Sequence, residues 1–186
     1  MSEINRRRYG LLQVLVPELF DEKNPGTILY VGACPQRCDF SSNLAAVGHE
    51  LTALEAWEKN VKALDATRFR RHFAYVIHGD VRRLTEADLP HRTYDFVFWW
   101  HGPEHVDCSE MPPAVKALEN ITIRTVVLAS PWGIAPEGAV WGNPHNTHRS
   151  YLYYLDYARL NYEVAALGPK DRMGGGLIAW KRKRTG

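Results

Sequence analysis

The chain has 186 residues, 45% of them hydrophobic and 24% charged, which is the composition of a soluble domain with a sizeable core. Its 23 basic and 21 acidic side chains nearly balance, so it lacks the basic excess of proteins that mainly coat nucleic acid. It shows no membrane-spanning apolar run, no signal-peptide pattern and only three cysteines, so we expect a cytoplasmic protein without a disulfide scaffold.

The first half of the chain alternates apolar runs with amphipathic segments. From the N-terminus we expect a helix at 9–20, a strand at 27–32, a helix at 39–47, a strand at 50–56, a helix at 57–64, a strand at 72–80 and a short helix at 85–89. Gly48 is the stop signal of the second helix.

The second half continues the alternation and then changes it. Here we expect a strand at 94–102, a helix at 111–120, a strand at 124–133, a helix at 148–160 and two closely spaced strands at 162–168 and 174–183. This order predicts a doubly wound α/β fold: a mostly parallel seven-stranded sheet with helices on both faces and an antiparallel final strand. We expect one domain over 1–186, with a lead-in at 1–26 and an α/β core at 27–182.

Polar or small residues end the first three predicted strands. Gly32 ends the first strand, Glu55 follows 23 residues later at the end of the second, and Asp80 ends the third. Ligands of open α/β sheets bind outside the carboxyl ends of the strands. A carboxylate at the spacing of Glu55 suits the hydroxyl groups of a ribose.

Several segments, in order, resemble the class I S-adenosylmethionine-dependent methyltransferases. They are "ILYVGAC", "LTALEAWEKNVKAL", "VIHGDVRRL", "YDFVFWWHGPEHV" and the closing pair "NYEVAALGP" and "GGGLIAWKRK". The resemblance covers roughly residues 27–182. A further stretch, "GAVWGNPHNTHRSYL", resembles a segment of small methyltransferases.

The resemblance implies S-adenosylmethionine as the cofactor and a set of residues that would bind it. Gly32 would let the chain pass closely beneath the cofactor, Glu55 would accept from the ribose and Asp80 from the adenine amino group. The implied cofactor-binding residues are Gly32, Ala33, Cys34, Glu55, Ala56, Asp80, Val81, Trp100, His101 and Gly102.

The first loop departs from the family pattern, which usually has a second glycine at the position of Cys34. Cys34 and Pro35 narrow the space for the amino-acid part of the cofactor, and Pro35 offers no backbone donor. A nicotinamide dinucleotide is disfavoured more strongly, because its fingerprint needs three glycines and only Gly32 is present.

The methyl acceptor is expected to be a small molecule, methylated on oxygen or nitrogen. His101 and His105 are the candidate catalytic bases, because histidine exchanges protons near neutral pH. The candidate substrate-binding residues are Trp132, Trp141, His145 and His148. The segment "HGPEH" lacks the Asn/Asp-Pro-Pro-aromatic wall of base-flipping enzymes, so nucleic acid is a disfavoured acceptor.

Other interpretations remain open at this point. "HGPEHVDC" contains possible metal ligands and Cys34 and Cys38 form a C-x3-C pair, but no second pair accompanies it, so we expect no metal. The altered first loop also fits a non-catalytic methyltransferase-like scaffold. The basic clusters near both termini keep an RNA methyltransferase as a further alternative.

Overall fold

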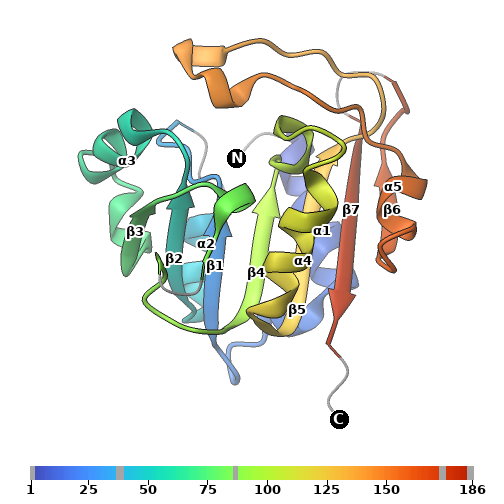
Figure 1. Ribbon diagram of the computed structural model, residues 1–186. Coiled ribbons are helices and arrows are strands. Elements are labelled where there is room, and N and C mark those ends of the chain that lie inside the picture. The colour runs from blue at the N-terminus through green and yellow to red at the C-terminus, as the bar shows by residue number, and fades with distance from the viewer. Residues whose placement is uncertain (1–2, 37–39, 86–87, 172–174, 184–186) are drawn as a thin grey trace.

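The predicted apolar runs form the strands of one sheet. The computed structural model describes residues 3–36, 40–85, 88–171 and 175–183 (Figure 1). Within them lie seven strands: β1 (Thr27–Val31), β2 (Glu50–Glu55), β3 (Tyr75–His78), β4 (Tyr94–Trp100), β5 (Thr122–Pro131), β6 (Glu163–Leu167) and β7 (Gly176–Arg182). The α-helices are α1 (Glu3–Leu15), α2 (Ser41–Val47), α3 (Glu58–Asp65), α4 (Met111–Asn120) and α5 (Tyr154–Ala158).

The strand order across the sheet is β3-β2-β1-β4-β5-β7-β6. The first five strands pair in parallel, whereas β7 lies antiparallel between β5 and β6. The chain first builds outward from β1 to β3, and then resumes at β4 on the other side of β1. The predicted fold class is confirmed, and the reversal between β1 and β4 is the expected place for a ligand.

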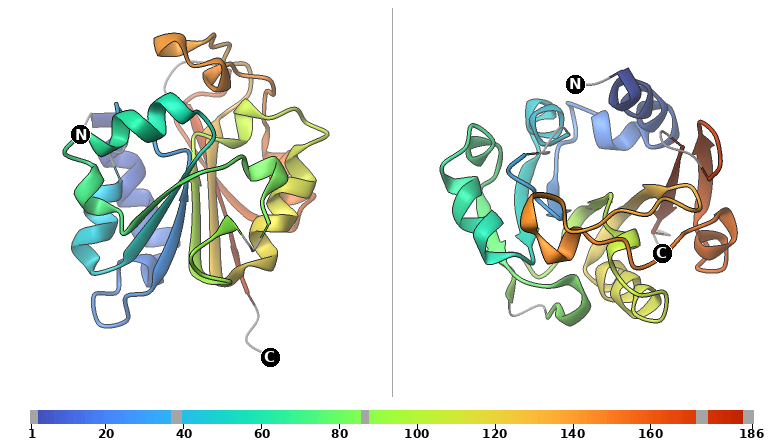
Figure 2. Two further views of the ribbon diagram at one scale, coloured as in Figure 1. Left: turned by 60° about the vertical axis from the view of Figure 1, so that its left-hand side comes forward. Right: turned by 90° about the horizontal axis from the view of Figure 1, so that it is seen from above.

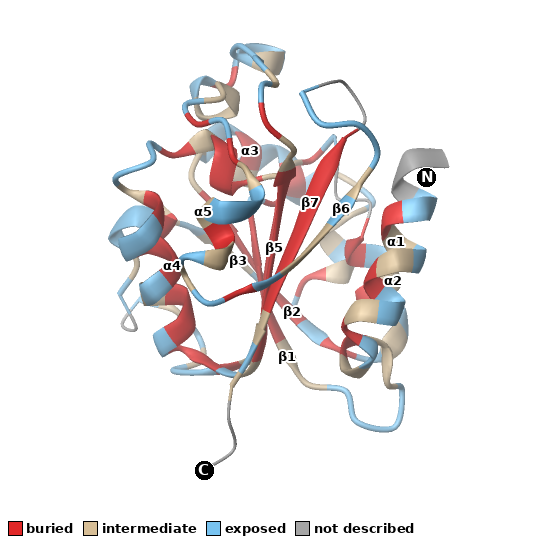
Figure 3. Ribbon diagram, turned by 90° about the vertical axis from the view of Figure 1, so that its right-hand side faces the viewer, coloured by how far each residue is buried: buried red, intermediate tan, exposed pale blue. Residues whose placement is uncertain are grey.

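Successive side chains of the central strands enter two separate cores. On β4, Phe96, Phe98 and Trp100 face one core, while Val97 and Trp99 face the other. Figure 3 shows the buried sheet between α1 and α2 on one side and α4 and α5 on the other. Since both faces are covered, the strands are almost wholly apolar, and this is why they stand out in the sequence.

The opening helix differs from the prediction of 9–20. Helix α1 begins at Glu3 and ends at Leu15, and Pro17 starts a separate 3-10 turn, Pro17–Phe20. The residue before a proline is pushed out of the helical region, and Val16 has a φ of −132°. The predicted helix therefore combines the end of one helix with a second short turn.

The predicted helix at 148–160 is shortened to α5. The amide groups of Arg149 and Ser150 donate to the carbonyl oxygen of Glu104, and this contact holds residues 148–153 against the loop after β4 in a non-helical conformation. The helix begins after Tyr153, whose amide donates to the Asp156 carboxylate at 2.7 Å. Contacts with a distant loop thus override the local helical pattern.

The remaining elements follow the prediction with smaller changes. β3 is shorter than the predicted 72–80, because Arg70–His72 form a 3-10 turn. Gly48 ends α2 in the left-handed conformation, as expected, whereas the predicted start of that helix at Asp39 lies outside the described residues. The predicted helix at 85–89 also includes residues outside them. No helix in the described part of the chain is long and apolar enough to cross a membrane.

Candidate active site

A cavity of about 240 Å³ lies at the carboxyl ends of β1, β2, β3 and β4. Residues 137–149, from the long connection after β5, complete its wall. This connection arches over the ends of the strands in orange in Figure 1, and the view from above in Figure 2 shows it crossing the middle of the sheet. The cavity therefore occupies the reversal of strand order.

The structure brings most of the predicted site residues to this cavity. Those that line it are Gly32, Cys34, Glu55, Ala56, Asp80, Val81, Trp100, His101, Gly102, His105, Trp141, His145 and His148. Ala33 is instead fully buried in the core beside α2, and Trp132 packs against the core on the other face. Cys38 lies outside the described residues.

Gly32 makes the turn that opens the cavity after β1. Its φ of +80° belongs to the left-handed region, and its amide donates to the Leu54 carbonyl at 2.8 Å. A Cβ added at Gly32 would have no atom within 4 Å among the described residues, so it would project into open space. Gly32 thus has a left-handed backbone conformation, which favours glycine, and it borders open space at the cavity.

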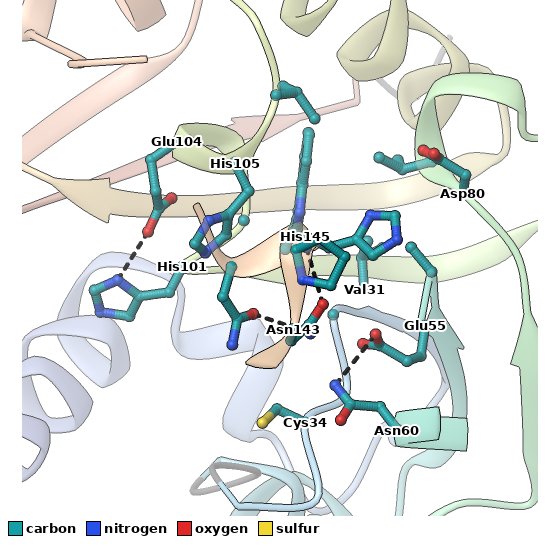
Figure 4. Close-up of a pocket in the computed structure, with 18 of the residues that line it drawn as sticks. Val31, Cys34, Glu55, Asn60, Asp80, His101, Glu104, His105, Asn143 and His145 are labelled. Atoms are coloured by element: carbon teal, nitrogen blue, oxygen red, sulfur yellow. Dashed lines mark hydrogen bonds and ion pairs between the residues drawn. The ribbon is translucent and has the colours of Figure 1, made fainter. Parts of the chain in front are cut away.

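Glu55 is a buried carboxylate at the end of β2, with 5% of its surface exposed. Its Oε1 atom accepts from the Trp57 amide at 2.9 Å and from Asn60 at 3.3 Å, as Figure 4 shows for Asn60. Burial raises the pKa of Glu55 to about 7, against the lowering effect of these two hydrogen bonds. Both bonds go to Oε1, which leaves Oε2 for a ligand.

Asp80 lies after β3 and is held by Arg82. The Arg82 side chain donates to both oxygens of the carboxylate, with distances of 2.6 Å to Oδ2 and 3.0 Å to Oδ1. Burial acts to raise the pKa of Asp80, but the hydrogen bonds from Arg82 outweigh it and lower the pKa overall. Asp80 is thus an oriented, ionised acceptor at the cavity rim.

His101 lies just after β4 and has both ring nitrogens engaged. Arg8 of α1 donates to Nε2 at 2.6 Å, so Nδ1 carries the proton and donates to Oε1 of Glu104 at 3.1 Å (Figure 4). Burial acts to raise the pKa of Glu104, but the hydrogen bond from His101 and the neighbouring histidines lower it overall. Arg8, His101 and Glu104 thus form a hydrogen-bonded array in which the buried Glu104 carboxylate is ionised.

Replacing Arg8 by methionine should reduce the free energy of unfolding by about 2–4 kcal/mol, because the buried Glu104 carboxylate would lose a nearby cation. Arg8 is 8% exposed. Urea denaturation measures the change, and Arg6→Met on the exposed side of the same helix is the matched control. Equal stability of the two variants would show that Arg8 does not stabilise the array.

The segment after β5 brings further polar groups over the cavity. The buried Asn143 side chain accepts from the His145 amide at 2.9 Å and donates to Asn146 at 3.2 Å. Burial lowers the pKa of His145, so this imidazole is neutral at pH 7. Trp141 is 49% exposed, with a φ of +54°. This segment thus presents a neutral imidazole and an accessible aromatic ring.

Three residues that hold side chains of the cavity in place have no clear signal in the sequence. Arg8 belongs to a run of arginines in the first helix, and its contact with His101 spans 93 residues. Asn60 follows Glu55 by five residues, and its approach to the carboxylate depends on the start of α3. Arg82 follows Asp80 by two residues, and the 3-10 turn Val81–Arg83 after β3 brings the two side chains together.

Comparison with known proteins finds similarity of structure alone: no family model and no curated protein matches the sequence. The N-methyltransferase NodS from Bradyrhizobium japonicum WM9 superposes with a TM-score of 0.66 at 15% identity, over 97% of both chains. Magnesium protoporphyrin IX methyltransferase (ChlM) from Synechocystis PCC 6803, with bound S-adenosylhomocysteine, gives 0.65 at 16% identity, over 97% of this chain and 85% of that one. The N-terminal domain of EvdMO1, in the presence of S-adenosylhomocysteine and D-fucose, gives 0.67 at 18%, over 99% and 84%.

Proposed function

We propose, from the class I methyltransferase fold that this chain has, that it is a single-domain S-adenosylmethionine-dependent methyltransferase acting on a small molecule. The observation that carries the proposal is the placement of Gly32, Glu55 and Asp80 around one cavity at the strand-order reversal. The structural neighbours with S-adenosylhomocysteine bound support the choice of cofactor.

The residues present fit this cofactor. The open space beside Gly32 admits the methionine part, which a side chain at this position would obstruct. Oε2 of Glu55 is available to accept from the ribose hydroxyls, and Asp80 can accept from the adenine amino group beside Val81. The half-buried Cys34 and the backbone of Ala33 lie next to Gly32, and Ala56 lies next to Glu55.

The acceptor would approach from the side of the β4 loop and the connection after β5. Trp100, His101 and Gly102 would form the wall nearest the reacting atoms, and Trp141, His145 and His148, from the connection after β5, would contact the acceptor. When bound, the cofactor would supply a methyl group on a sulfonium, and the cavity would hold an acceptor lone pair in line with it. The protein's main task is then alignment, which can lower the barrier by about 7–11 kcal/mol.

The two candidate bases differ in their availability. Because Arg8 and Glu104 engage both nitrogens of His101, we assign His101 a positioning role. His105 uses Nδ1 toward the Thr147 carbonyl at 3.4 Å, and no hydrogen bond to its Nε2 is found within the described residues. We therefore assign His105, through Nε2, to the acceptor end of the cavity.

Isothermal titration calorimetry with S-adenosylhomocysteine tests the cofactor proposal. One molecule should bind per chain, and Glu58→Ala should bind it with unchanged affinity, because Glu58 is exposed and pairs with Lys62 on the outer face of α3. Absence of binding at millimolar ligand would overturn the enzyme proposal and favour a non-catalytic scaffold.

A further inference from the structure

A cluster of three potential metal ligands lies at the acceptor end of the cavity. Glu104 and His105 belong to the 3-10 turn Pro103–His105 after β4, and His148 comes from the connection after β5. One ligand atom from each of the three residues lies within 4.8 Å of the other two. Figure 4 shows Glu104 and His105 side by side at this end of the cavity.

Both histidines are oriented as metal-binding histidines are. Nδ1 of His105 lies 3.4 Å from the Thr147 carbonyl oxygen, and Nδ1 of His148 contacts the Ala135 carbonyl oxygen. A carbonyl only accepts, so each Nδ1 carries a proton, and in the neutral rings Nε2 keeps its lone pair. A hydrogen bond from the non-ligating nitrogen to a carbonyl is the usual support of a metal-bound imidazole.

The Glu104 carboxylate resembles the two histidines in that one of its oxygens accepts a hydrogen bond and the other has no hydrogen-bond partner in the part of the chain that the structure describes. Oε1 accepts from His101, which Arg8 holds in turn. Oε2 is buried and has no hydrogen-bond partner within the described residues. An unpaired carboxylate oxygen in a residue that is 1% exposed is costly, and a cation would relieve this cost.

A second carboxylate, that of the partly exposed Glu137, lies beside one of the two histidines. Oε2 of Glu137 lies 3.2 Å from Nε2 of His148, whose side chain is 6% exposed. Since Nδ1 of His148 already donates to a carbonyl, an unprotonated Nε2 and a carboxylate would be two acceptors at hydrogen-bond distance. A proton or a metal ion between them removes this conflict.

We propose that Glu104, His105 and His148 bind one divalent first-row transition metal ion such as Zn²⁺, and that Glu137, which lies beside His148 but outside this group of three, moves in as a fourth ligand. Two imidazoles and a carboxylate are a common donor set for such ions. Tetrahedral ligands at about 2.0–2.2 Å from zinc lie about 3.4 Å apart, so the three side chains close by about an ångström on binding.

The role of the ion rests on the proposed function, whereas its binding does not. An acceptor hydroxyl displacing Glu137 from the ion would lose its proton to water more readily, because the cation stabilises the oxyanion. That oxygen would then be placed to attack the methyl carbon, with the carbon–sulfur bond breaking and its electron pair staying on sulfur. His105 acts here as a ligand rather than as a base.

The test titrates ZnCl2 by calorimetry into tag-free, chelator-treated protein in the absence of cofactor. The wild-type chain should bind one ion, Glu104→Gln and His148→Asn should weaken binding at least about 100-fold, and Glu137→Gln less. His91→Asn is the matched control, since His91 is a half-buried histidine that pairs with Glu50 at the amino end of β2, away from the cavity at the carboxyl end. Circular dichroism confirms that each variant is folded.

Co²⁺ absorption gives a second measurement that does not depend on calorimetry. Visible bands of nitrogen-ligated cobalt should appear in the wild type and in His91→Asn, and should disappear in His148→Asn. The site is refuted if the wild type binds no ion, or if Glu104→Gln and His148→Asn bind it as tightly as the wild type. Binding of S-adenosylhomocysteine to the same samples separates that result from failure of the proposed function.

Discussion

Replacing Glu55 by glutamine should weaken the binding of S-adenosylhomocysteine by about 10- to 100-fold. The ribose hydroxyls would lose a charged acceptor, and such hydrogen bonds contribute about 1.5–3 kcal/mol. Glutamine keeps an oxygen for the Trp57 amide and for Asn60, so the fold is retained. Calorimetry measures the affinity, with Glu58→Gln as the control. Equal affinity of Glu55→Gln and the wild type would remove Glu55 from the cofactor site.

The same substitution should have a pH-dependent effect on stability. The pKa of Glu55 is 4.5 when unfolded and about 7 when folded, so the native state holds the proton more tightly. The tighter proton binding adds to the free energy of unfolding. This stabilisation is fully present below pH 4.5 and is lost as the pH rises through 7. Glu55→Gln cannot ionise, so at pH 8 it should be more stable than the wild type by on the order of 3 kcal/mol, and near pH 4.5 nearly equal. Cofactor affinity of the wild type should rise between pH 6 and 8, while that of the variant stays flat.

Replacing Gly102 by alanine should destabilise the protein by about 3 kcal/mol or more. The added Cβ would lie 1.7 Å from Nε1 and 2.1 Å from Cδ1 of Trp99, whose ring is buried and cannot move aside. The loop that carries His101 and Glu104 would have to shift, so cofactor binding should weaken as well. Urea denaturation measures the first effect and calorimetry the second.

Gly10→Ala is the matched control for Gly102→Ala. Gly10 lies within α1, and its added Cβ would meet no atom within 4 Å among the described residues. Alanine is a better helix former than glycine, so this variant should gain about 0.5–1 kcal/mol. A Gly102→Ala protein as stable as the wild type would contradict the packing seen around Trp99.

The sheet could be predicted from the sequence because its inner strands are buried on both faces and therefore read as continuous apolar runs, although the edge strands β3 and β6 are only partly covered. Glu55 could be placed for the same reason, since it ends the buried run of β2, whereas Asp80 was placed by the apolar residues of the edge strand β3, none of which is buried. The helix at 148–160 could not be predicted correctly. Its first part is held by the Glu104 carbonyl, more than 40 residues away, and no local pattern records that contact.

The acceptor end of the cavity was the least predictable part. The sequence offers Glu104 and His105 as adjacent residues, but His148 joins them only through the path of the chain after β5. The expectation of no metal rested on the spacing of cysteines and histidines along the chain, which does not describe ligands assembled by tertiary structure. Trp132, in contrast, was singled out by its position after β5, yet the fold turns it toward the core.

The loop after β4 and the connection after β5 are joined into one unit by backbone hydrogen bonds. The Glu104 carbonyl accepts from the amides of Arg149 and Ser150 at 2.8 and 3.1 Å, and the Ser150 hydroxyl donates to the Val106 carbonyl at 2.6 Å. A ligand beside Gly102 and a ligand beside His148 would therefore contact the same hydrogen-bonded piece of backbone. A shift of this backbone caused by one ligand would change the affinity for the other, and such a coupling is reciprocal: each ligand changes the affinity for the other by the same factor.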